Sequence, residues 1–127
     1  MNLMISKSKN TSTQLADAVI RGIQEVKVNE ICSLDLRKLP NSVCDFFIIC
    51  HGTSDTQVDA IARSVLKTVS EDLNENPVHK EGMNQAEWIL LDYFDVVVHI
   101  FKEEARRFYN LEKLWADADV KEIEYQL

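Results

Sequence analysis

One stretch of the sequence limits the fold more than any other. Residues 44–51, Cys-Asp-Phe-Phe-Ile-Ile-Cys-His, are apolar almost without interruption. Such a run is typical of a central strand covered on both faces. Gly52-Thr53-Ser54 ends the run, and Ser54-x-x-Gln57 has the form of a helix capping box. A buried strand that leads directly into a capped helix predicts an α/β protein.

The rest of the chain supplies the other elements of such a fold. Thr11-x-x-Gln14 is another capping box, and the apolar spacing after it predicts a helix over about 12–28. A second helix is predicted to end near residue 73, and a third to run from about Lys102 to Leu111 or Trp115. Strands are predicted at 30–36, 44–51, around 78–80, 88–92 and 95–101. The order α-β-β-α-β-β-β-α predicts a single mixed sheet of about five strands flanked by helices.

Length and charge narrow the class of protein. The 127 residues are expected to form one domain, 1–127, with a flexible polar tail at 1–10 and a loosely ordered acidic tail at 117–127. No apolar run approaches the ~20 residues that cross a bilayer, and the polar N-terminus lacks the apolar part of a signal peptide. Membrane and secreted classes are therefore excluded, and a cytoplasmic location is expected.

The net charge of −7 argues against a protein that grips nucleic acid through its phosphates. The acidity concentrates in residues 77–127, which carry 6 basic and 11 acidic side chains. This distribution suits a basic protein partner, or it serves only to keep the surface solvated. Cys32, Cys44 and Cys50 show no metal-site or redox spacing and are expected to be reduced, mostly buried thiols.

The hairpin at 88–101 is the most informative feature for function. If Tyr93 and Phe94 form a two-residue turn, Asp92 opposes Asp95 and Trp88 opposes His99. One face of the hairpin is then wholly aliphatic and is predicted to be core: Ile89, Leu91, Val96, Val98 and Ile100. The other face is too apolar for water alone and too charged for a dry interior: Trp88, Leu90, Asp92, Asp95, Val97, His99 and Phe101.

Two interpretations of this mixed face remain open. In the first, a helix covers its apolar part and the two aspartates cap the turn at the rim of the sheet. In the second, the face is a docking surface with Trp88 as the aromatic anchor and Asp92 and Asp95 at its rim. Opposed aspartates repel each other, and a cationic partner between them would remove that repulsion. His99 is expected to be a packed, hydrogen-bonded histidine.

The corner Gly52-Thr53-Ser54 also allows an enzymatic interpretation, because backbone N–H groups at a helix N-terminus can bind phosphate. A nucleotidyltransferase would also need carboxylates that converge on Mg²⁺. No Asp-x-Asp or Asp-x-Glu pair occurs between residues 77 and 101, and phosphate-binding Walker sequences are absent. No catalytic residue, cofactor or metal site is therefore predicted. A nucleotide-binding or nucleotidyltransferase enzyme that uses this corner stays the alternative.

An ordered series of segments between residues 15 and 117 resembles the ribosomal silencing factor family, also called the Iojap-like family. This family has bacterial, mitochondrial and chloroplast members. The segments are Leu34-Asp35-Leu36-Arg37, Asp45-Phe46-Phe47-Ile48-Ile49, Gly52-Thr53-Ser54-Asp55-Thr56-Gln57-Val58, Glu81-Gly82, Trp88-Ile89-Leu90-Leu91-Asp92-Tyr93, Asp95-Val96-Val97-Val98-His99-Ile100-Phe101 and Arg106-x-x-Tyr109-x-Leu111-Glu112-x-Leu114-Trp115.

The resemblance implies a nucleotidyltransferase-like fold without enzyme activity. It also implies that the chain binds large-subunit ribosomal protein L-fourteen and sterically blocks the small subunit from joining, which represses translation when nutrients are scarce. Some family members assist large-subunit assembly, several form homodimers, and direct nucleic-acid recognition is not expected. The plain N-terminus favours a bacterial member over an organelle-targeted one.

The resemblance and the hairpin together predict the contacts with the ribosomal protein. Trp88 is the expected anchor, with Leu90 and Tyr93 extending it. Glu81, Asp92 and Asp95 are expected to face basic side chains of the partner. Glu112 and Trp115 are expected to pack the third helix.

The sequence departs from the family at the hairpin turn. The family usually reads Asp-Tyr-Gly-Asp there, whereas this chain has Phe94 at the glycine position. Glycine adopts positive φ freely and phenylalanine does not, so the turn is expected to differ in type or length, which affects the pairing register. A third interpretation of the chain is a dimeric adaptor that binds another basic protein through the acidic C-terminal segment.

Overall fold

A single mixed sheet forms the centre of the molecule. The computed structural model describes residues 10–28, 30–115 and 118–123. Its six strands lie in the order β3-β4-β5-β2-β1-β6. Only β2 and β5 pair in parallel; the other neighbours are antiparallel. The strands are β1 (Ile31–Asp35), β2 (Phe46–Gly52), β3 (His79–Glu81), β4 (Trp88–Asp92), β5 (Val96–Lys102) and β6 (Asp119–Ile123). The predicted α/β class is confirmed, with one strand more than the five expected.

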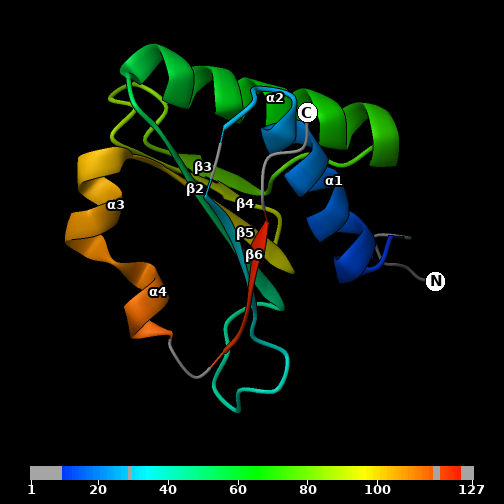
Figure 1. The fold of residues 1–127 in the computed structure, drawn as a ribbon. Helices are drawn as coiled ribbons and strands as arrows, with labels where there is room; N and C mark the ends of the chain where they lie inside the picture. Colours follow the sequence, from blue (N-terminus) through cyan, green and yellow to red (C-terminus); the bar gives the residue numbers. More distant parts are fainter. Residues whose placement is uncertain (1–9, 29, 116–117, 124–127) are drawn as a thin grey trace.

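Helices flank the sheet on both sides (Figure 1). The long helices α1 (Ser12–Gln24) and α2 (Asp55–Leu73) cover one face, and the short helices α3 (Glu103–Tyr109) and α4 (Leu111–Leu114) lie on the other. The capping box at Thr11 forms as predicted. At α2 the Ser54 hydroxyl accepts from Gln57 N, but the Gln57 side chain accepts from Thr53 N and not from the N-cap. Only half of the second box is therefore present.

The strand that defined the fold class is buried on both faces. Ile48 and Cys50 of β2 belong to the core beneath α1 and α2. Phe47 and Ile49 belong to a second, smaller core on the opposite face. The three cysteines are free and buried, as expected. Burial raises the pKa of Cys32 to about 11 and the pKa of Cys44 and Cys50 to about 12, so these thiols are neutral at physiological pH.

The third predicted helix is broken in two. Asn110 adopts the left-handed conformation, with φ 49°, and ends α3 by donating its N–H to the carbonyl of Arg106. The largely buried Arg106 then ties the two short helices to the sheet. Its guanidinium binds the Glu112 carboxylate on α4 and also donates to the Glu30 carbonyl at 2.6 Å and to His51 Nδ1 at 2.9 Å.

The predicted loosely ordered tail at 117–127 is wrong for residues 119–123, which form the edge strand β6 beside β1. Ile123 packs against the core beneath α1 and α2, and Ala118, just before the strand, is buried in the smaller core. The sequence pattern did not predict this strand because only two of its five side chains are apolar. The flexible tail predicted at 1–10 falls outside the described residues except for Asn10, and so do 117 and 124–127 of the acidic tail.

The β4–β5 hairpin is shifted by two residues from the predicted pairing, so that register was wrong. Trp88 lies opposite Phe101, Leu90 opposite His99 and Asp92 opposite Val97. The turn is displaced because Phe94 takes φ 76° at its tip and Tyr93 pairs with Val96 instead. The predicted repulsion between opposed aspartates therefore does not arise. An even shift keeps each strand residue on its predicted face, and the five predicted core residues are all fully buried.

Candidate docking surface

The mixed face of the hairpin lies on the side of the sheet that carries α3 and α4. Strand pairing places Glu81, Leu90 and His99 in one row across β3, β4 and β5. Asp92 and Val97 form part of the next row. Leu90, Asp92 and Val97 are half-buried and Glu81 is exposed, so the short helices leave this part of the sheet partly open.

Trp88, at one end of this face, is held in place by three neighbouring side chains. Its indole Nε1 donates a hydrogen bond to His99 Nδ1 at 3.1 Å. The ring centroids of Phe101 and Tyr109 lie 4.9 and 4.6 Å from that of Trp88. Because the side chain is half-buried and fixed on several sides, it presents a preformed aromatic surface.

The close passage of β3 past β4 depends on a glycine. Gly82 follows Glu81 with φ 80°, and a Cβ atom there would collide with the backbone carbonyl of Trp88. The pair Glu81-Gly82 therefore combines an acidic side chain with the residue that lets the backbone approach Trp88.

His99 is packed and hydrogen-bonded, as predicted. It is 5% exposed, and its ring meets the Phe47 ring edge-on with centroids 4.8 Å apart. Burial lowers the pKa of His99 to about 4, so the ring is neutral at physiological pH. Since Nδ1 accepts from Trp88, the proton resides on Nε2, which is buried without a hydrogen-bond partner.

The first interpretation of the mixed face holds for part of it, and the rest is accessible enough for the second to stay a prediction. Tyr109 of α3 packs on Trp88, so a helix covers one side of the anchor. Asp92 caps the turn, because its Oδ1 accepts from Phe94 N at 2.8 Å. The region around Leu90 and Val97 stays partly accessible. We refer to Glu81, Trp88, Leu90, Asp92 and Val97 as the Trp88 face.

One predicted contact lies away from the Trp88 face, and another lies in the hairpin turn. Tyr93 is 4% exposed and points into the core beneath α1 and α2, so its predicted place on the docking surface is wrong. Alternation along β4 carries it to the opposite side of the sheet from Asp92. Asp95 lies in the turn, where its carbonyl accepts from the backbone N–H groups of Asp45 and Phe46.

Two exposed aromatic residues near Trp88 were not predicted as part of this surface. Phe108 is 81% exposed and Tyr109 is 50% exposed at the end of α3, with their rings in edge contact at 5.1 Å. They extend the apolar surface from Trp88 onto the helix. The available signal was a pair of adjacent aromatics after the charged run Glu103-Glu104-Ala105-Arg106-Arg107.

The Gly52-Thr53-Ser54 corner is occupied by its own side chains. Gln57 Oε1 accepts from Thr53 N at 2.8 Å and lies 3.2 Å from Thr53 Oγ1. The carboxylate of Asp55, in the first turn of α2, pairs with Lys102 Nζ at 2.8 Å. A phosphate at this corner would therefore compete with interactions that the chain already makes. Among the described residues, no three His, Cys, Asp or Glu side chains are grouped to hold a metal ion.

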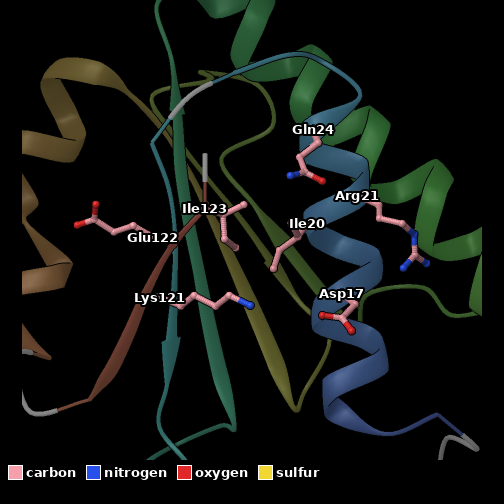
Figure 2. A pocket seen from close by; sticks show the side chains of 7 residues that line it. All are labelled: Asp17, Ile20, Arg21, Gln24, Lys121, Glu122 and Ile123. Atoms are coloured by element: carbon pink, nitrogen blue, oxygen red, sulfur yellow. The ribbon is translucent and has the colours of Figure 1, made fainter. Parts of the chain in front are cut away.

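A groove of about 600 Å³ lies between α1 and β6, away from the Trp88 face (Figure 2). Its charged side chains have both signs, and Ile20 and Ile123 supply its apolar part. The full lining is Asp17, Ile20, Arg21, Gln24, Lys121, Glu122 and Ile123. Two buried side-chain atoms in the described residues have no hydrogen-bond partner, Tyr93 Oη and His99 Nε2, and neither lines this groove.

None of the described helices is both long and apolar enough to span a bilayer.

Comparison with known proteins gives a consistent result. The sequence profile described as "Ribosomal silencing factor during starvation" matches residues 9–126. The ribosomal silencing factor RsfS of Halalkalibacterium halodurans is 39% identical over 114 residues, which cover 90% of this chain and 96% of that protein. RsfS of Bacillus subtilis is 44% identical over 100 residues, covering 78% and 82%. A crystal structure of a Chromobacterium violaceum protein superimposes with a TM-score of 0.79 at 30% identity, covering 93% of this chain and 94% of that one.

Proposed function

This chain belongs to the ribosomal silencing factor family, and we propose that it represses translation by occlusion. In this proposal it binds large-subunit ribosomal protein L-fourteen through the Trp88 face and occupies space that the small subunit needs. The mechanism requires affinity and bulk but no bond-making step, so the proposed protein is not an enzyme. We place its action in the cytoplasm, on the large ribosomal subunit.

The observation that carries this proposal is the fixed orientation of a half-exposed tryptophan. Interfaces concentrate their binding energy in a few aromatic anchors surrounded by weaker contacts. An anchor that is already ordered loses little conformational entropy when a partner covers it. Trp88 meets this description because His99, Phe101 and Tyr109 hold its ring before any partner arrives.

The charges around the anchor support a basic partner. Glu81 and Asp92 lie on the Trp88 face, and the whole chain carries −7. Complementary charges at the rim of an interface steer the encounter and select the partner more than they add affinity. A surface rich in Lys and Arg on the ribosomal protein would therefore be favoured over an acidic one.

Replacement of the anchor tests the proposal. Trp88→Ala should weaken binding to purified large subunits about 30-fold, because truncation of a central aromatic anchor typically costs about 2 kcal/mol or more. Co-sedimentation measures the loss, and circular dichroism checks that the variant is folded. Ile20→Ala, in the groove between α1 and β6, is the matched control and should bind like the wild type. Equal binding by folded Trp88→Ala and wild-type protein would reject the Trp88 face as the docking site.

The enzymatic alternative has a separate test. Calorimetric titration with ATP or GTP and Mg²⁺ should give no binding heat if the corner at Gly52 has no nucleotide site. Saturable heat that strengthens in Gln57→Ala would instead favour the nucleotide-binding interpretation, because this variant frees Thr53 N from the side chain that accepts its hydrogen bond.

A further inference from the structure

Phe94 occupies a backbone conformation that suits it poorly. It lies at the tip of the β4–β5 hairpin with φ 76°. Asp95 N donates to the Tyr93 carbonyl at 3.0 Å, which closes a three-residue turn centred on Phe94. Turns of this type with positive φ are rare and strained, and a bulky residue in that region is a clear outlier. The hairpin therefore stores strain at this position.

The Phe94 side chain makes few contacts within the protein that could offset the backbone strain. It is 75% exposed, and no aromatic or cation–π contact to it is found among the described residues. Its backbone N–H is used, since it donates to Asp92 Oδ1, but any residue except proline could make that bond. Strain and exposure are thus both unfavourable and are not offset by the benzyl group within the chain.

The tip that carries Phe94 is nevertheless rigid. The Asp92 carboxylate holds it from β4, and Tyr93 N bonds to the Val96 carbonyl across the turn. On the other side, the Asp95 carbonyl accepts from Asp45 N at 2.8 Å and from Phe46 N at 3.1 Å. The backbone of Phe94 is therefore held at a fixed place, two residues beyond Asp92 at the end of the Trp88 face.

We infer that Phe94 is a specificity-determining contact, whose ring enters an apolar depression on the basic protein that covers the Trp88 face. Strain that the surrounding structure maintains is typical of functional sites. The Asp92 carboxylate beside the ring would meet a cationic side chain at the edge of that depression. This inference rests on the proposed function and adds a second, peripheral contact that selects among ribosomal surfaces.

The test measures the thermal stability of the protein and its affinity for large subunits, which should change in opposite directions. Phe94→Gly relieves the strain, so its thermal midpoint should rise by roughly 3–5 °C. The same variant should bind purified large subunits about tenfold more weakly, because the ring is lost. Phe94→Asn also tolerates positive φ without an apolar ring and should lose binding equally, whereas Phe94→Leu should keep most of the affinity.

Three outcomes contradict the inference, and they differ from a failure of the proposed function. Binding of Phe94→Gly within about twofold of wild type, while Trp88→Ala loses binding, removes the role of Phe94 and leaves the docking surface intact. Conversion of a dimer to a monomer by Phe94→Gly, with subunit binding unchanged, assigns the ring to a second copy of the chain. If the thermal midpoint of Phe94→Gly falls together with its affinity, the Phe94 ring stabilises the fold and is not a contact with the partner. If wild-type protein does not bind large subunits, the proposed function itself is rejected.

Discussion

His99 stabilises the orientation of Trp88 while its own second ring nitrogen stays without a hydrogen bond. A buried unsatisfied donor is unfavourable by about 1–3 kcal/mol, and native structures contain few of them. The geometry gives this one a reason, because Nδ1 must be unprotonated to accept from the Trp88 indole. The proton is thereby forced onto Nε2, where no partner is present.

The buried neutral histidine makes stability depend on pH. Its pKa is lowered from 6.5 to about 4 in the folded protein. Between these values the unfolded chain binds the proton more readily, so the free energy of unfolding should fall as the pH falls from 6.5 to about 4. The contribution of His99 to this loss is at most about 3 kcal/mol, and it is absent above pH 6.5.

A pair of variants isolates this contribution from other groups that titrate in the same range. Urea denaturation of wild type and His99→Leu between pH 7 and 4 should show a steeper loss in the wild type. The leucine variant should also shift Trp88 fluorescence, whereas His99→Asn keeps an acceptor near the Nδ1 position and should shift it less. Identical pH dependence in wild type and His99→Leu would show that burial of His99 does not have the assigned effect.

At the scale of the elements, Arg106 determines where α3 and α4 lie. Three groups far apart in the sequence converge on its guanidinium: the Glu30 carbonyl, His51 Nδ1 and the Glu112 carboxylate. Burial and the nearby Arg106 charge lower the pKa of His51, which keeps its Nδ1 free to accept. Since α3 carries Tyr109 against Trp88, this cluster also supports one side of the Trp88 face.

Removal of the guanidinium should be strongly destabilising. Arg106→Ala leaves the partly buried Glu112 carboxylate without its partner and also removes the bonds to the Glu30 carbonyl and His51, which should lower the free energy of unfolding by about 2–4 kcal/mol. Arg63→Ala breaks the exposed pair with Asp59 and should change stability by less than about 1 kcal/mol. Chemical denaturation compares the two. Equal effects of the two variants would contradict the assigned role of Arg106.

The elements also show why part of the fold could be predicted and part could not. Local signals predicted correctly the capped start of α1 at Thr11 and the doubly buried strand β2. The place of the two short helices after the break at Asn110 involves Arg106, which reaches Glu30 across 76 positions of sequence. The strand β6 depends on pairing with β1 more than on its own composition. These features arise from contacts that a single segment does not encode.

The candidate site, too, could be predicted from the sequence only in part. Alternation along the strands placed Trp88, Leu90 and Asp92 correctly on one face, and the two-residue error in register did not move them. Tyr93 was misplaced because the predicted turn put it outside the alternation. The exposed pair Phe108-Tyr109 escaped notice because its nearness to Trp88 follows from the packing of α3 on the sheet.

At the scale of the whole molecule, the proposed occlusion depends on the shape of the protein. Its two long helices cover one face of the sheet, and its shorter helices leave the Trp88 face partly open on the other (Figure 1). One face can then bind a partner while the bulk of α1 and α2 extends away from the contact. A small domain so arranged can obstruct a large neighbouring surface without changing its own conformation.

The most direct test of this account measures the joining of purified ribosomal subunits by light scattering. Wild-type protein bound to the large subunit should lower the yield of joined ribosomes in proportion to its occupancy. Trp88→Ala at the same concentration should allow joining to proceed nearly as it does without the protein. Normal joining in the presence of large subunits saturated with wild-type protein would contradict the central claim.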